Sequence, residues 1–212
     1  MSRQEINECP VRHYEGPVNI VRSKADLSAA IEELRKETIL GFDTETRPAF
    51  TKGRKYPPAL VQLGGEHAVY LFQLRILKFP GKLRRILSDP GIIKAGVSLD
   101  FDVAQLKKMG DFSPAGFVDL GDAARQSGIK NHGLRGLTAV LLGFRITKKA
   151  QTSNWARETL LPSQKRYAAT DAWVGRKLYL QMVEQGMIVT GSPDRVQVSE
   201  PARLRMGRER LL

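Results

Sequence analysis

The sequence predicts an α/β fold in which a mixed β-sheet has helices on both faces. Two apolar runs at 59–65 and 67–74 flank a Gly-Gly-Glu turn at 64–66, a pattern typical of an antiparallel β-hairpin. Strand-like and helix-like segments then alternate from about 81 to 120, which is typical of parallel strands joined by helices. Because both kinds of connection occur in one chain, the sheet is expected to be mixed rather than uniformly parallel.

The first part of the chain predicts one helix and the strands that precede the hairpin. The run VNIVRS near 17–23 has the character of a short strand. We expect Ser23 or Asp26 to cap a helix that extends to Lys36, because apolar residues recur there at helical spacing. The run TILGFDTET at 38–46 then predicts a strand.

The rest of the chain predicts two more strands and several helices. Residues that break regular structure mark the ends of these elements: Asp89-Pro90-Gly91 ends the first helix, Gly110 ends the second, and Pro162 begins the last. The expected strands are 92–99 and 117–120, and the expected helices are 81–88, 101–109, 120–127, 134–142 and about 162–186.

Length and composition indicate one globular domain. With 212 residues, of which 42% are hydrophobic and 26% charged, the chain can bury a core, and no apolar run approaches the roughly 18–20 residues of a membrane span. The opening lacks the apolar stretch of a secretory signal, so a cytoplasmic location is expected. The single cysteine, Cys9, excludes an internal disulfide and multi-cysteine zinc sites. We expect a loose polar lead-in over 1–16, one domain over 17–190 and an exposed basic arm over 191–212.

Charge indicates the kind of partner. The chain has 34 Lys and Arg against 22 Asp and Glu, which gives a net charge of +12. A basic surface gains affinity for nucleic acid because each neutralised phosphate releases condensed counterions. Nucleic acid is therefore the expected partner; the sequence indicates no membrane contact and no particular protein partner.

Paired acidic residues in GFDTET suggest a catalytic site. Residues two apart on a strand point to the same face, about 6.5–7 Å from each other, so Asp43 and Glu45 are expected to lie side by side. Carboxylates on a largely apolar strand are unfavourable unless a partner or a cation neutralises them. The alternative is a solvated position at the end of the strand.

Two further segments carry acids that can join this pair. Tyr167 and Asp171 lie four residues apart on a predicted helix, and small alanines around them allow the helix to approach the sheet closely. Asp102, or its neighbour Asp100, follows a buried strand at the edge where open α/β sheets bind ligands. The alternatives are a packed ring with a surface charge, and a simple helix cap.

A cluster of four such carboxylates requires cations. Like charges repel one another unless divalent ions neutralise them, and oxygen ligands favour Mg²⁺ or Mn²⁺. Two such ions about 3.5–4 Å apart activate water and stabilise the entering and leaving oxygens of a phosphodiester. On a basic protein this chemistry is that of a nuclease.

The motifs GFDTET, KAGVSLDFD and YAATDAW resemble those of the DEDDy 3′–5′ exonucleases, which are D-x-E, a mid-chain Asp and Y-x-x-x-D. ALVQLGG and SNWA followed by QKRYAATDA are most similar to the subgroup of the Werner syndrome helicase exonuclease domain and its stand-alone relatives. Ribonuclease D is a more distant resemblance. The similarity covers about 17–186.

The resemblance implies a ribonuclease H-like fold with a five-strand mixed sheet, and a role for each acid. Asp43 would contact both metal ions, Glu45 and Asp171 would complete the first metal site, and Asp102, in preference to Asp100, would hold the second through water. Tyr167 would align the attacking water with Glu45. The implied reaction releases nucleoside monophosphates from the 3′ end of DNA. RNA 3′-end trimming and a catalytically silent nucleic-acid-binding module are the alternatives.

Candidate nucleic-acid-binding residues surround these motifs. Side chains next to the acids are expected to border the terminal nucleotide, and an acid-free basic loop is expected to follow the phosphate backbone. Trp155 either stacks on a base or packs at a helix junction. The candidates are Thr44, Leu60, Gln62, Arg47, Lys52, Arg54, Lys55, Lys148, Lys149 and Trp155.

Overall fold

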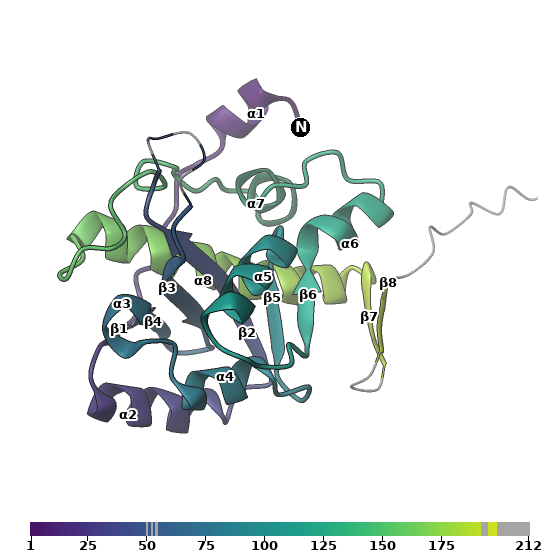
Figure 1. The fold of residues 1–212 in the computed structure, drawn as a ribbon. Helices are drawn as coiled ribbons and strands as arrows, with labels where there is room; N and C mark the ends of the chain where they lie inside the picture. Colours follow the sequence, from purple (N-terminus) through teal and green to yellow (C-terminus); the bar gives the residue numbers. More distant parts are fainter. Residues whose placement is uncertain (50, 52, 54, 192–194, 199–212) are drawn as a thin grey trace, which may run out of the picture.

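The computed structural model describes residues 1–49, 51, 53, 55–191 and 195–198. Its centre is a six-stranded sheet in the order β1-β4-β3-β2-β5-β6 (Figure 1). The hairpin and its neighbour β2 pair in antiparallel fashion, whereas β1 with β4, β2 with β5, and β5 with β6 are parallel. The strands are β1 (Val18–Val21), β2 (Ile39–Thr46), β3 (Pro58–Gly64), β4 (Val69–Gln73), β5 (Ile93–Gly96) and β6 (Phe117–Asp119).

The predicted mixed α/β fold is confirmed, with one difference in the number of strands. The resemblance implied five strands, and the sheet has six because β1 adds to the edge of the hairpin by pairing with β4. The short apolar run at 17–23 had indicated this strand.

Helices cover both faces of the sheet (Figure 1). One apolar cluster lies between the sheet and the side that carries α2, α4 and α5, and two others lie on the side of α8. The helices are α1 (Arg3–Glu8), α2 (Lys24–Leu34), α3 (Leu74–Leu77), α4 (Gly81–Leu87), α5 (Leu99–Met109), α6 (Leu120–Gln126), α7 (Leu134–Leu142) and α8 (Pro162–Glu184).

The long helix α8 lies unusually close to the sheet. A Cβ atom added at Gly41 would collide with the carbonyl oxygen of Ala172, and one added at Gly175 would lie 2.7 Å from the carbonyl oxygen of Ala95. The backbones of strand and helix are therefore in direct contact, with no side chains between them. This contact fixes the height of α8 above β2 and β5, as the small residues of the helix had predicted.

The N-terminal segment is folded, contrary to the loose lead-in expected for 1–16. The side chain of Ser2 caps α1 by accepting a hydrogen bond from the N–H of Glu5. The side chain of Glu5 accepts one from the N–H of Ser2, which completes a capping box. Ile6 is buried, and Val11 forms a β-bridge with Arg145. Contacts with a distant part of the chain stabilise this segment. Such contacts leave no periodic pattern in the local sequence, so the fold of this segment could not be predicted from it.

The C-terminal segment also differs from the expectation of an arm that starts at 191. Strand β7 (Ile188–Gly191) pairs with β8 (Arg195–Val198) to form a separate two-stranded antiparallel ribbon. The remainder of the expected arm lies outside the described residues. Among the described helices, none has the length and apolar character needed to cross a bilayer.

Candidate active site

Asp43 and Glu45 stand on the central strand β2 and point toward α8. Alternate residues of a strand point to opposite faces, and the sheet register pairs Asp43 with Gln62 and Glu45 with Leu60. Leu60 packs in one cluster with Ala168 of α8. The two carboxylates therefore lie on the α8 side of the sheet, on the same face, as their spacing predicts.

Helix α8 brings a third carboxylate to this strand. Oxygen atoms of Asp43, Glu45 and Asp171 all lie within 4.8 Å of one another, and we call these three residues the acid group. Asp171 is more than 120 positions away in the chain, and the backbone contact at Gly41 sets its distance from the strand. The predicted convergence of these three acids is confirmed.

Burial and mutual repulsion raise the pKa values in the acid group. Desolvation is the largest cause for Asp43, whose pKa lies well above its ordinary value, and the charges of Asp171 and Asp102 act in the same direction. Desolvation, followed by the neighbouring acids, raises the pKa of Glu45 to about 10. Burial raises the pKa of Asp171 to about 7. The site alone therefore holds protons that a bound cation would displace.

Tyr167 lies one helical turn before Asp171 and contributes its hydroxyl to the site. Burial is the main cause that raises the pKa of the phenol, and the charges of Asp171 and Glu45 add to it. The hydroxyl therefore remains protonated at neutral pH and is available as a hydrogen-bond donor. Its ring packs against Trp155, with 5.8 Å between the ring centroids.

Asp102, the fourth predicted acid, is not a member of the acid group, but its charge acts on two of the three carboxyls. Thr44 points to the opposite face of β2, and its hydroxyl donates a 2.6 Å hydrogen bond to Oδ1 of Asp102. Burial raises the pKa of Asp102 to about 6, against the effect of this hydrogen bond. The charge of Asp102 in turn raises the pKa of Asp43 and Glu45. Asp102 is thus within electrostatic range of the acid group, while Thr44 holds its side chain.

A sharp turn aims Asp102 inward. Ser98, which precedes α5, has a left-handed backbone with φ 62°, and the N–H of Leu99 donates to Oδ2 of Asp119 at 2.9 Å. Asp119 also caps α6, so it serves as a cap at the end of a strand. The first turn of α5 then directs Asp102 inward and leaves Asp100 exposed.

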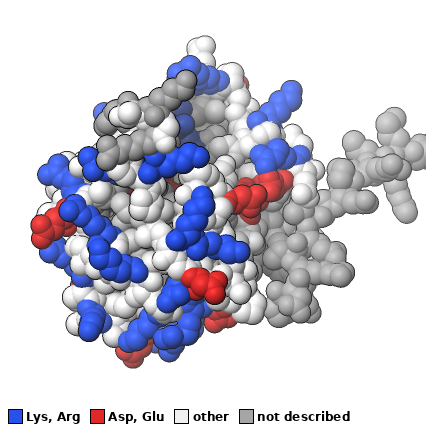
Figure 2. Space-filling model, in the orientation of Figure 1, with Lys and Arg blue, Asp and Glu red and all other residues white. Residues whose placement is uncertain are grey.

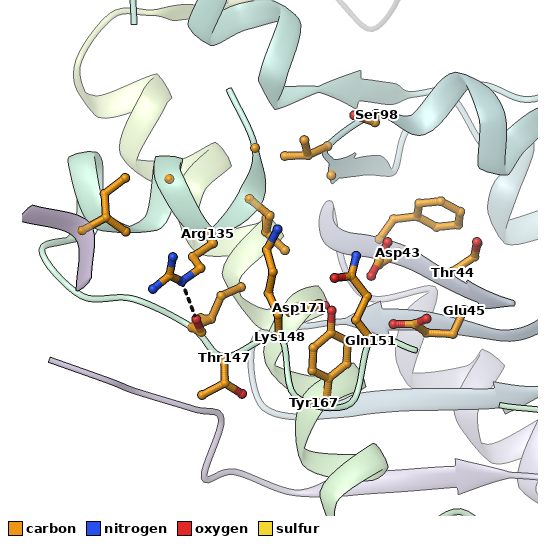
Figure 3. Close-up of a pocket in the computed structure, with 18 residues that line it drawn as sticks. Asp43, Thr44, Glu45, Ser98, Arg135, Thr147, Lys148, Gln151, Tyr167 and Asp171 are labelled. Carbon is orange, nitrogen blue, oxygen red and sulfur yellow. Dashed lines mark hydrogen bonds between the residues drawn. The ribbon is translucent and has the colours of Figure 1, made fainter. Parts of the chain in front are cut away.

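A cavity of about 420 Å³ opens over the acid group, and we call it the acid pocket. Tyr167 and the three acids line one part of it. Lys148 and Arg135 line another, and Figure 3 shows Lys148 between Arg135 and Asp171. The pocket therefore presents cations opposite carboxylates, an arrangement suited to a phosphate group with metal ions beneath it.

Arg135 lines the acid pocket, although no motif in the sequence indicates it. Its Nε donates to the carbonyl oxygen of Ile146 at 3.2 Å, and its Nη2 donates to Oδ1 of Asn7 in α1 at 2.7 Å. No carboxylate in the described part of the chain lies within 4.0 Å of it. One signal was available: a cation in the first turn of a predicted helix is disfavoured by the helix dipole, which suggests a separate role.

Three predicted nucleic-acid-binding residues are buried, and for Trp155 this favours packing at a helix junction, one of the two alternatives, over stacking on a base. Leu60 and Gln62 are 0% exposed and Trp155 is 1% exposed. With its side-chain amide nitrogen directed toward Asp43, Gln62 donates to the carbonyl oxygen of Asp43 at 3.1 Å and to Oδ2 of the same residue at 3.3 Å. Trp155 donates to the carbonyl oxygen of Gln151 at 3.2 Å. Leu60 and Gln62 therefore lie beside the acids within the sheet, and Trp155 supports the ring of Tyr167.

The remaining candidates divide by position. Thr44 is buried and its hydroxyl is bound to Asp102. The exposed candidates are Arg47, Lys55, Lys148 and Lys149. Of these, Lys148 lines the acid pocket. Lys52 and Arg54 lie outside the described residues.

The acid group fits divalent cations. Oδ1 of Asp171 is buried and has no hydrogen-bond partner, and leaving such an atom unsatisfied costs about 1–3 kcal/mol or more. Carboxylate oxygens are the ligands that hard cations prefer. A cation among the three acids would satisfy this oxygen and remove the repulsion that raises their pKa values.

The profile of the 3′–5′ exonuclease family matches residues 18–186, from β1 to the end of α8. The chain belongs to the 3′–5′ exonuclease family. It is 30% identical over 187 residues to the bifunctional 3′-5′ exonuclease/ATP-dependent helicase WRN of Mus musculus, covering 84% of this chain and 13% of the relative. It is 29% identical over 203 residues to ribonuclease D of Gluconacetobacter diazotrophicus, covering 91% of this chain and 50% of the relative. The chain thus spans half or less of these exonuclease relatives.

Solved structures agree with the family assignment at the level of the fold. The crystal structure of the Aedes aegypti Nibbler EXO domain superimposes with a TM-score of 0.72 at 24% identity, and the match covers 83% of this chain and 91% of that domain. The fold is therefore ribonuclease H-like, and its acid group is typical of metal-dependent exonucleases of this family.

Proposed function

We propose that this chain hydrolyses phosphodiester bonds of DNA from the 3′ end and releases nucleoside monophosphates. The observation that carries the proposal is the acid group, whose three carboxylates lie within 4.8 Å of one another in a pocket with cations opposite. Membership of the 3′–5′ exonuclease family supports it. Burial and mutual repulsion raise the pKa values of these carboxyls, which favours their neutralisation by a bound cation.

The proposed cofactors are two Mg²⁺ or Mn²⁺ ions. When bound, they would neutralise the acids, supply an activated water and stabilise negative charge on the phosphate. Asp43 is proposed to contact both ions, and Glu45 and Asp171 to complete the first site. Asp102, which is held by Thr44, is proposed to reach the second ion through water.

Other side chains of the acid pocket position the reactants. Tyr167 keeps its proton, so its hydroxyl can orient the attacking water toward the phosphorus by donating or accepting a hydrogen bond without becoming a nucleophile. Glu45 lies on the same side and can accept from that water. Lys148 and Arg135 face the acid group and are placed to contact phosphate oxygens.

RNA is the second candidate substrate, because one of the relatives, matched over 91% of this chain, is a ribonuclease D. The same metal chemistry acts on either sugar, and only contacts with the 2′-hydroxyl discriminate between them. A catalytically silent module is disfavoured, since such a module has no need for three clustered acids, two of them buried. We further propose that 17–190 forms the catalytic domain, which the family match over 18–186 supports.

The test uses a 5′-labelled DNA and an RNA of the same sequence, each incubated with Mg²⁺ or Mn²⁺. A ladder of products shortened from the 3′ end of DNA is expected, and it should disappear with EDTA. In Asp43→Ala, we expect turnover to fall by at least about 1,000-fold, which corresponds to about 4 kcal/mol of transition-state stabilisation. DNA affinity should stay within about threefold, because the cations of the pocket remain. A ladder on RNA alone would support the second candidate, and unchanged turnover in Asp43→Ala would remove this residue from catalysis.

A further inference from the structure

The described surface has a second cavity, away from the acid group, that no step above uses. Its volume is about 670 Å³, larger than that of the acid pocket. It lies between the start of β3, helix α3 and the end of α5. Its apolar part comes from Pro58, Ala59, Leu74 and Met109.

Cations line this cavity and acids do not, so we call it the basic cavity. Its cations are Arg47, Arg75, Lys78 and Lys108. Positive charge alone would not distinguish it, since Figure 2 shows Lys and Arg over much of this face of the molecule. Two other cavities are different in this respect, because Asp26 and Glu33 line one and Glu15 lines the other. The basic cavity is distinguished by its large volume together with apolar and cationic lining residues and no lining acid.

Two of the four cations are held in position. Nη1 of Arg75 donates to the carbonyl oxygen of Ala156 at 2.6 Å. The guanidinium of Arg47 lies over the ring of Tyr56, 5.0 Å from its centroid. No carboxylate in the described ranges pairs with any of the cations of this cavity, so their charge is available to an anion.

The basic cavity is connected to the acid pocket through two elements. Arg47 follows Glu45 by two residues at the end of β2, and the register of β2 and β3 pairs Thr46 with Pro58. Ala156 follows Trp155, whose ring packs against Tyr167. The basic cavity and the acid pocket therefore adjoin the same end of β2 and the same segment around Trp155.

We propose that the basic cavity is a second nucleotide subsite, which binds a single-stranded segment just upstream of the 3′-terminal nucleotide. This inference rests on the proposed function, since that function puts the 3′ end in the acid pocket. The cations would contact backbone phosphates. The ring of Tyr56, the planar guanidinium of Arg47 and the apolar floor would contact the face of an unpaired base, which a duplex keeps stacked inside.

The experiment compares two neighbouring lysines of α5. Lys108 lines the cavity and Lys107 does not, although both are exposed in the last turn of the same helix. Lys108→Glu and Lys107→Glu therefore change the net charge and the helix dipole equally. Each is assayed on two substrates: a single strand of about 12 nucleotides, and the p-nitrophenyl ester of thymidine 5′-monophosphate, which is small enough for the acid pocket alone. Circular dichroism checks that both variants fold.

We expect Lys108→Glu to raise KM for the strand about tenfold and to leave kcat/KM for the ester unchanged. Lys107→Glu should change either value by less than about threefold. The salt dependence of strand binding should also weaken, with a slope smaller by about 0.7 for each phosphate that the variant no longer neutralises. Equal effects of the two lysines on the strand would overturn the proposal, because they would indicate diffuse attraction. A reduction in affinity in Lys108→Glu that is larger for a blunt duplex than for the single strand would overturn it as well.

Binding measured without catalysis separates this inference from the proposed function. Fluorescence anisotropy with the labelled single strand is recorded in EDTA on Asp43→Asn, alone and combined with Lys108→Glu or Tyr56→Ala. Weaker binding in both combinations, beside a wild type that cleaves neither DNA nor RNA, would support the subsite and refute the proposed activity. Cleavage by the wild type with unchanged binding in both combinations would refute the subsite and leave the activity standing.

Discussion

Replacing Asp171 by asparagine is predicted to make the metal-free protein more stable at alkaline pH. Burial raises the pKa of this carboxyl from 3.8 to about 7 in the folded chain. Because the folded state binds the proton more tightly, its stability is highest below pH 4 and falls as the pH rises toward 7. Each pKa unit corresponds to about 1.36 kcal/mol, so the full effect is about 4 kcal/mol. About 3 kcal/mol of it falls between pH 5 and pH 8.5.

The assay is urea unfolding followed by circular dichroism, in EDTA, at pH 5 and pH 8.5. The wild type should lose about 3 kcal/mol more than Asp171→Asn between these two pH values. In thermal unfolding this equals about 6–12 °C for a chain of this length. Asp100→Asn is the matched control, since Asp100 is an exposed acid outside the group. The same pH dependence in wild type and Asp171→Asn would refute the reasoning.

Three further changes test the site and its support. Tyr167→Phe should lower kcat by about 10²-fold or more with little change in KM, measured by steady-state kinetics, because only the water-orienting hydroxyl is lost; full activity would show the hydroxyl to be dispensable. Arg135→Gln should raise KM about tenfold at constant kcat, since one charge-assisted phosphate contact is removed; a fall in kcat alone would contradict this role. Gly41→Ala should destabilise the protein by about 3 kcal/mol in urea unfolding, because the new methyl group meets the backbone of α8 at Ala172, and a stability equal to wild type would contradict the direct contact. Metal affinity, measured by calorimetry, should rise with pH between 6 and 9 as protons leave the acid group; a flat profile would argue against raised pKa values.

Local signals in the sequence predicted most of the fold. The sequence indicated Ser23 or Asp26 as the cap of α2, and in the structure the two residues cap it together. The position of Asp43 and Glu45 on one face followed from the period of a strand. Their proximity to Asp171 was predictable because the small alanines of α8 leave room for a close approach of the helix to the sheet.

Features that depend on distant contacts could not be predicted in this way. Helix α1 has only six residues. Its Asn7 side chain accepts a hydrogen bond from Arg135, which lies 128 positions later in the chain. The hydrogen bond between Thr44 and Asp102 depends on the left-handed turn at Ser98, which nothing in the local pattern required. Burial of Trp155 was one of two alternatives, and the packing of the helix junction decided between them.

The bare contact between β2 and α8 has a consequence for the choice of ion. Because Gly41 lies directly against the backbone of Ala172, no side chains separate the strand and the helix that together carry the acid group. The three carboxylates of the acid group therefore have little freedom to move apart around a larger ion. Mg²⁺ requires ligands at about 2.0–2.1 Å, whereas Ca²⁺ requires about 2.3–2.6 Å. A rigid site of this kind should discriminate by ionic radius, so that Mg²⁺ sustains turnover and Ca²⁺ does not.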